Sequence, residues 1–132
     1  MSSNNFKLKV YYEDTDAGGI VYYANYLKYL ERARTELINN KGLSNKILKE
    51  KFNIFLVVRS CTIDFIKPAF LEDVLEVKTS IVKTSRIQFF LSQIILKDKE
   101  IIAKAKVRIV ALNDKRKISR LTKELSFIIF SK

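Results

Sequence analysis

The sequence predicts an α+β fold in which an antiparallel sheet wraps around one long central helix, and three observations carry this prediction. Segments with the alternating pattern of β-strands outnumber the single long segment with helical spacing. The helical segment follows the first strand-like segment and precedes the other four, so helices and strands do not alternate along the chain. A length of 132 residues suits one domain, and we expect residues 1–132 to form it.

The first strand and the long helix lie near the N-terminus. Residues 6–12 read F-K-L-K-V-Y-Y, an alternation that predicts a half-buried strand. Residues 13–19 are acidic and contain two glycines, so they predict a loop. Over residues 22–40 apolar side chains recur every three or four positions, which predicts an amphipathic helix of about five turns that stops at Gly42. The apolar positions of this helix are Tyr22, Tyr26, Tyr29, Leu30, Ala33 and Leu37.

The remaining chain predicts four more strands. In the last of them, apolar residues alternate with Lys104, Lys106 and Arg108, so one face is apolar and the other is largely basic. Residues 97–100 form a polar turn that joins this strand to the preceding one as a hairpin. Alanines on the apolar face leave room for the helix to lie across it. The four strands are expected at residues 53–67, 74–83, 87–96 and 101–110.

Two segments have no single prediction. Residues 43–51 follow the long helix and are compatible with a second, short helix. The tail, residues 121–132, contains F-I-I-F at positions 127–130, which fits either another strand or a segment packed against the core.

The composition excludes several kinds of site. The absence of histidine excludes Ser-His-Asp and Cys-His nucleophilic sites and zinc sites that use histidine. Three glycines cannot supply the glycine-rich loops that hold nucleotide phosphates. The single cysteine, Cys61, cannot form an intrachain disulfide, which suits a reducing cytosol, and we expect it to be a small buried residue. If the protein is an enzyme, carboxylates must carry out its proton transfers.

The chain is strongly basic, with 25 Lys and Arg residues against 14 Asp and Glu residues and a net charge of +11. This charge fits a polyanionic partner, such as nucleic acid, a membrane surface or a phosphorylated cofactor, or a lysine-rich surface with no partner. The aromatic-basic motif of RNA-binding modules is absent, so we expect no nucleic-acid partner. No segment approaches the ~20 apolar residues of a membrane span, and residues 1–10 lack the apolar centre of a signal peptide. We therefore expect a soluble, cytoplasmic protein with no integral membrane segment.

An acidic loop that leads directly into a helix has chemical consequences. The first N–H groups of a helix lack helical partners and carry partial positive charge, so they stabilise an anion or a developing oxyanion. A carboxylate beside them can deliver or activate a nucleophile, and glycines allow close approach of a ligand. The same acids can instead cap the helix, so the residues alone leave both interpretations open.

The loop and helix also resemble a known family. Residues 11–36, Y-Y-E-D-T-D-A-G-G-I-V-Y-Y-A-N-Y-L-K-Y-L-E-R-A-R-T-E, resemble the signature of YbgC-type acyl-CoA thioesterases, within the 4-hydroxybenzoyl-CoA thioesterase family. Residues 61–77, C-T-I-D-F-I-K-P-A-F-L-E-D-V-L-E-V, are similar to the family's second strand, proline turn and third strand. The resemblance covers residues 6–125. It implies the hotdog fold, an acyl-CoA substrate, and active sites at the interface of a homodimer whose edge strands pair, often within a homotetramer.

The resemblance assigns roles to residues of the loop. The family's catalytic aspartate corresponds to Asp16, with Asp14 as the alternative if the loop register differs. The backbone N–H that polarises the substrate carbonyl corresponds to Tyr23, where YbgC-type proteins commonly have histidine. Val21 and Tyr22 are expected to line the approach to it. The implied reaction is thioester hydrolysis without a metal or cofactor, in which Asp16 either attacks the carbonyl or activates water.

Charged residues outside the loop have expected roles too. Residues 83–86, K-T-S-R, are similar to a turn that contacts coenzyme A in related thioesterases, so Ser85 and Arg86 are the predicted phosphate-binding residues. Residues 97–123 contain ten basic residues and three acids, which suits docking of an acyl carrier protein. Glu31 is catalytic in a different hotdog branch, but here we expect an ion pair with Arg32 or Arg34.

Two alternatives stay open. The protein could be a non-catalytic module that binds acyl-CoA or an acyl carrier protein, because a fold does not dictate activity. YbgC-type proteins are associated with the Tol-Pal envelope machinery, so a peripheral location at the inner membrane stays open beside the cytoplasm.

Overall fold

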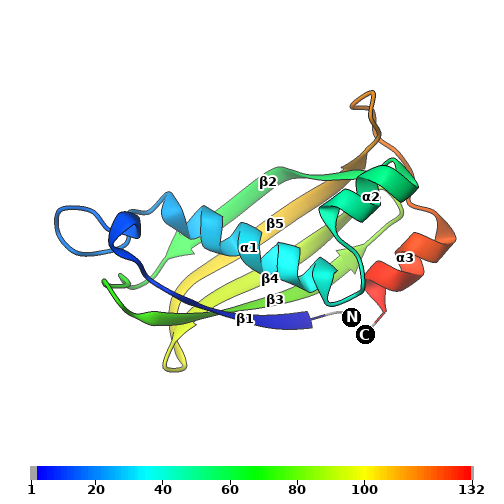
Figure 1. Ribbon diagram of the computed structural model, residues 1–132. Helices are drawn as coiled ribbons and strands as arrows, with labels where there is room; N and C mark the ends of the chain where they lie inside the picture. Colours follow the sequence, from blue (N-terminus) through cyan, green and yellow to red (C-terminus); the bar gives the residue numbers. More distant parts are fainter. Residues whose placement is uncertain (1–2, 132) are drawn as a thin grey trace.

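The computed structural model describes residues 3–131, which form a five-stranded antiparallel sheet with three α-helices. The strands are ordered β1-β3-β4-β5-β2 across the sheet. Figure 1 shows α1 lying across one face of the curved sheet, which confirms the predicted α+β class. In chain order the elements are β1 (Ser3–Lys9), a 3₁₀ turn (Tyr12–Asp14), α1 (Asn25–Asn39), α2 (Asn45–Phe52), β2 (Phe55–Phe65), β3 (Val74–Thr84), β4 (Gln88–Lys97), β5 (Glu100–Leu112) and α3 (Lys123–Phe130).

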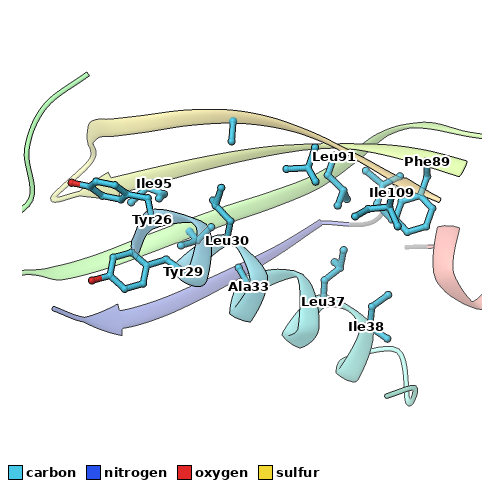
Figure 2. Packing of buried hydrophobic residues seen from close by; sticks show 14 of the residues in the cluster. Tyr26, Tyr29, Leu30, Ala33, Leu37, Ile38, Phe89, Leu91, Ile95 and Ile109 are labelled. Carbon is cyan, nitrogen blue, oxygen red and sulfur yellow. The ribbon is translucent and has the colours of Figure 1, made fainter. Parts of the chain in front are cut away.

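The central helix α1 buries nearly all of its predicted apolar stripe. Figure 2 shows these side chains facing Leu91, Ile95 and Ile109 of the sheet. Burial of each large side chain contributes about 1.5–3 kcal/mol. The helix has 15 residues, about four turns, because residues 22–24 form a tight turn in which Asn25 N donates to Tyr22 O. The buried residues of α1 are Tyr26, Tyr29, Leu30, Ala33, Leu37 and Ile38.

The hairpin predicted at residues 97–100 joins β4 to β5. Its two central residues, Asp98 and Lys99, have φ angles of 48° and 69°. Positive φ at both positions is the backbone of a type I′ turn, whose twist matches that of the paired strands. The two predicted faces of β5 are confirmed, with Ala103, Ala105, Val107 and Ile109 buried and Lys104 and Lys106 exposed.

The first strand ends earlier than predicted. β1 stops at Lys9, and Tyr12 belongs to the 3₁₀ turn. The carboxylate of Asp14 accepts a hydrogen bond from the backbone N–H of Tyr11 at 2.9 Å, which turns the chain away from the sheet. The pattern of residues could not show this, because Tyr11 and Tyr12 continue the run of apolar side chains.

The tail forms the helix α3 rather than a strand. Thr122 caps this helix by accepting a hydrogen bond from Leu125 N at 3.0 Å, and Leu125 and Ile129 are buried one turn apart. Four successive apolar residues at 127–130 obscured that helical spacing. Lys132 lies outside the described residues. Residues 43–51 were compatible with a short helix, and α2 forms there.

No helix in residues 3–131 is long and apolar enough to cross a bilayer.

The two edge strands of the sheet differ. β1 has seven residues and includes two lysines, whereas β2 has 11 residues and leaves Val58 and Phe65 exposed. Cys61, which we expected to be buried, is also exposed in β2. The reason is that α1 packs over β1 and β3 and leaves the β2 side of the sheet largely uncovered. A long, apolar, exposed edge is a surface on which another strand can pair.

Candidate active site

The loop between β1 and α1 folds back on itself as a small hairpin. Asp16 N donates to Ile20 O at 2.9 Å, and Tyr22 N donates to Asp14 O at 3.0 Å, so the two arms are paired. Gly19 has a φ of +78°, which lets the chain reverse at the tip. The hairpin therefore brings Asp16, Val21 and Tyr22 into one compact unit directly before α1.

The two aspartates of the loop have opposite environments. Asp14 is only 6% exposed, and its carboxylate accepts the hydrogen bond from Tyr11 N. Its backbone oxygen also accepts a hydrogen bond from Asn25 Nδ2 at 2.8 Å, which ties the loop to the start of α1. Asp14 is thus a structural residue of the loop.

Asp16, by contrast, is exposed near the tip. Its Oδ1 accepts a hydrogen bond from Gly18 N at 2.8 Å, which holds the carboxylate in one orientation. No other hydrogen bond or ion pair engages this carboxylate within residues 3–131, so its second oxygen is available to a ligand. The two acids therefore differ in access, because the carboxylate of Asp16 is open to solvent and that of Asp14 is buried.

The backbone N–H of Tyr23 is free at the start of α1. The first turn is closed by bonds from Asn25 N to Tyr22 O and from Tyr26 N to Tyr23 O. Neither Tyr23 N nor Ala24 N donates a hydrogen bond to another described residue. These groups are therefore available to an anion or a polarised carbonyl, and the helix dipole adds to their positive potential.

An aromatic cluster lies beside this N–H group. The ring of Phe65, at the end of β2, packs against Tyr23 and Tyr26 with centroid separations of 6.0 and 5.5 Å. Tyr22 contacts Tyr23 at 5.0 Å and is itself half-exposed, whereas Val21 is buried in the core. Sequence reasoning missed Phe65, although its place at the apolar end of a predicted strand before Pro68 was a usable signal.

The predicted phosphate-binding residues lie far from the loop that carries Asp16. Ser85 and Arg86 follow β3 at its far end, whereas the start of β3 pairs with Lys9 beside the loop. Eleven strand residues span roughly 35 Å, so Asp16 and Arg86 are at opposite ends of the sheet (Figure 1). The Nε of Arg86 donates to Leu121 O at 2.8 Å, and the Ser85 hydroxyl accepts hydrogen bonds from Ile87 N and Gln88 N.

The expected ion pair of Glu31 is not formed. The described residues contain two ion pairs, Lys67–Glu100 and Lys97–Asp73, and neither involves α1. Arg34 instead donates from Nη1 to the side-chain oxygen of Gln93 at 3.0 Å, because it points toward the sheet. No group of three His, Cys, Asp or Glu side chains in residues 3–131 is placed to hold a metal ion.

Several known proteins are similar to this chain in sequence and in fold. An acyl-CoA thioesterase YbgC from Haemophilus influenzae is 35% identical over 109 residues, which cover 83% of this chain and 80% of that protein. A crystal structure described as a "Probable Thioesterase" from Bartonella henselae has a TM-score of 0.88 at 36% identity, covering 91% of this chain and 99% of that one. The 4-hydroxybenzoyl-CoA thioesterase from Pseudomonas sp. strain CBS-3 has a TM-score of 0.88 at 21% identity, which shows a common fold, and covers 97% of this chain and 99% of its own.

The family assignment rests on most of the chain. The sequence model of the thioesterase-like superfamily matches residues 10–126, which include the hairpin loop, α1 and strands β2 to β5. The chain belongs to the thioesterase-like superfamily and has the hotdog fold of its members.

Proposed function

We propose that this protein is an acyl-CoA thioesterase, which hydrolyses a thioester to a carboxylic acid and coenzyme A. The observation that carries the proposal is that one short segment supplies two groups, an exposed and oriented carboxylate at Asp16 and a free backbone N–H at Tyr23. This segment lies within the residues that the family model matches. The name of the Haemophilus relative supports the same reaction.

The chemistry uses these two groups. The Tyr23 N–H donates to the thioester carbonyl oxygen and stabilises the negative charge that develops there, an effect typically worth about 3–4 kcal/mol of barrier. Asp16 either takes a proton from water, whose oxygen then bonds to the acyl carbon, or attacks that carbon itself to form an anhydride that water opens. In both cases the C–S bond breaks and the sulfur leaves as a thiolate, which takes up a proton.

The proposed enzyme is a homodimer in which β2 pairs with β2 of a second copy, either alone or within a homotetramer. The exposed apolar edge of β2 supports this pairing. Antiparallel pairing about a two-fold axis would bring the Ser85–Arg86 end of one subunit toward the Asp16 loop of the other. One molecule of coenzyme A could then reach both sets of residues, with Ser85 and Arg86 on its phosphates and Val21 and Tyr22 near the thioester.

Asp16→Asn tests the proposal. Asparagine keeps an Oδ1 acceptor for Gly18 N, so the loop should keep its shape while the carboxylate is lost. Release of free thiol from a panel of acyl-CoA thioesters should fall about 10²- to 10⁴-fold, with an unchanged melting temperature. Undiminished hydrolysis in Asp16→Asn would contradict the assigned role, and the absence of hydrolysis of every thioester by the wild type would contradict the activity.

The second candidate is a non-catalytic acyl-thioester binding module, favoured by tyrosine in place of the family's common histidine at position 23. It predicts saturable binding of acyl-CoA without turnover. An acyl carrier protein is a proposed partner for either function, because Lys104 and Lys106 present positive charge on the outer face of the sheet. The proposed location is the cytoplasm, with peripheral association at the inner membrane as a further proposal.

A further inference from the structure

A largely apolar cavity of about 300 Å³ lies between α1 and β2. It is next to the C-terminal half of α1, whereas Tyr23 precedes the N-terminal end of that helix. Figure 2 shows Leu37 and Ile38 of α1 opposite Phe89, Leu91 and Ile109 of the sheet, in the region that forms the cavity floor. Residues 54–58 form its other wall, on the side of the exposed edge strand β2.

A single cationic side chain lines this apolar cavity. Arg34 is mostly withdrawn from water, and that burial lowers the pKa of its guanidinium, although the group stays charged. It makes no ion pair with any carboxylate of residues 3–131. Its partner is the neutral side chain of Gln93, through Nη1.

Gln93 fixes the orientation of Arg34. Gln93 is fully buried, and its Nε2 donates to Leu30 O at 3.0 Å and to Thr79 Oγ1 at 2.9 Å. With both amide protons used, its oxygen must face Arg34. A guanidinium has five N–H donors, so this contact leaves others without a partner among the described residues. Unpartnered guanidinium donors that line an apolar cavity are suited to a carboxylate, which they bind through short, charge-assisted hydrogen bonds.

The cavity is separated from the Tyr23 N–H of its own chain. The Phe65 ring packs on Tyr23 and Tyr26 at the N-terminal end of α1, and none of these three residues lines the cavity. Antiparallel pairing of β2 with β2 of a second copy would place residues 55–58 of one chain beside the Phe65 end of the other. The cavity would then adjoin the reactive loop of the partner subunit.

We propose that this cavity receives the acyl group of the substrate from the partner's reactive loop, and that Arg34 selects acyl groups that end in a carboxylate. The inference rests on the proposed thioesterase function and names its substrate class. Glu31 also lines the cavity, three residues before Arg34 on α1, and its negative charge opposes a carboxylate, so it moderates the preference.

Specificity ratios test the role of Arg34. The measured quantity is kcat/KM for ω-carboxyl acyl-CoA thioesters, from succinyl to suberyl, divided by kcat/KM for the unsubstituted thioesters of equal length. We expect the ratio to peak at the length whose carboxylate reaches Arg34. Arg34→Gln should lower the peak ratio about 10- to 100-fold, Arg34→Lys should lower it less, and Glu31→Gln should raise it. Arg32→Gln is the matched control, because Arg32 lies on the exposed face of α1 and should leave the ratio unchanged.

Binding of a free ligand separates this inference from the proposed activity. Monomethyl suberate carries one carboxylate and one neutral ester, as the substrate would. It should raise the melting temperature of wild type and Arg32→Gln but not of Arg34→Gln. No stabilisation of the wild type, or an unchanged ratio in folded Arg34→Gln, overturns the inference while thioester hydrolysis stands. Stabilisation that depends on Arg34 without any hydrolysis supports the carboxylate site and overturns the proposed enzyme.

Discussion

The hydroxyl of Tyr26 accepts a hydrogen bond from the backbone N–H of Ala69 at 3.1 Å, and both residues are buried. The backbone oxygen of the same Ala69 accepts a hydrogen bond from Val21 N at 2.9 Å. A single residue before β3, Ala69, is therefore hydrogen-bonded both to the first turn of α1 and to the arm of the hairpin that leads to Tyr23. This tie is what keeps the free N–H of Tyr23 in a defined position.

Tyr26→Phe should destabilise the protein, because it leaves the buried N–H of Ala69 without a partner. The expected loss is about 1–3 kcal/mol of unfolding free energy. Tyr29→Phe is the matched control on the same helix. The Tyr29 hydroxyl is buried and makes no hydrogen bond of ordinary geometry, although burial and then the nearby Asp14 carboxylate raise the pKa of Tyr29. Its removal should change stability by less than about 0.5 kcal/mol.

Urea unfolding of the two variants checks this pair. A larger loss in Tyr29→Phe than in Tyr26→Phe would show that the contact with Asp14 matters more than the tie to Ala69.

The adjacent glycines of the loop should respond differently to alanine. A Cβ on Gly18 would lie 3.2 Å from Asp16 Oδ1, so Gly18→Ala should displace the carboxylate. Misplacing a reactive group lowers rates steeply, and we expect kcat/KM to fall about tenfold or more with little change in stability. A Cβ on Gly19 meets nothing within 4 Å, but its φ of +78° is strained for alanine. Gly19→Ala should cost about 1–2 kcal/mol of stability.

Paired activity and melting measurements separate these effects. Full activity in Gly18→Ala would mean that the position of the Asp16 carboxylate is not critical.

The edge of β2 should control the oligomeric state. Val58 is 47% exposed on this edge strand, and Val58→Asp would place like charges near each other across the proposed two-fold axis. Sedimentation should show a shift toward monomer. Val82→Asp is the control, since Val82 is 56% exposed on β3, an interior strand of the sheet. Equal masses for both variants and the wild type would exclude β2 as the pairing edge.

Local sequence patterns predicted much of the fold, because the spacing of apolar side chains along the chain distinguishes a helix from a strand. The three- and four-residue spacing from Tyr26 to Leu37 predicted α1, and alternation predicted the faces of β5. The tail was harder, because the burial of Leu125 and Ile129 one turn apart is hidden in an unbroken apolar run.

The site depends on contacts that the sequence alone does not reveal. Asp14 and Asp16 are chemically alike and two residues apart, and the fold alone buries one and exposes the other. The bond between Arg34 and Gln93 joins residues 59 positions apart, so its formation depended on the packing of α1 against β4. The predicted ion pair of Glu31 with Arg32 or Arg34 was wrong, and for Arg34 the reason is that its side chain points to the sheet.

The placement of Asp16 and Arg34 leads to a prediction about subunit mixtures. In a dimer paired through β2, each cavity would face the reactive loop of the partner, so Asp16 of one chain would act together with Arg34 of the other. Neither the Asp16→Asn nor the Arg34→Gln homodimer would then contain a complete site for a carboxyl-terminated thioester. A mixed dimer would contain one site in which both residues are wild type.

Mixing separately purified Asp16→Asn and Arg34→Gln under conditions that allow subunit exchange should therefore restore hydrolysis of the preferred ω-carboxyl thioester. The gain should be absent for the unsubstituted thioester of equal length, because Arg34→Gln alone already hydrolyses it. If each chain used its own Asp16 with its own Arg34, every mixed dimer would lack a complete site, and the rate would equal the sum of the separate homodimers. Additive rates, measured after mass analysis confirms exchange, would rule out catalysis across the β2 edge.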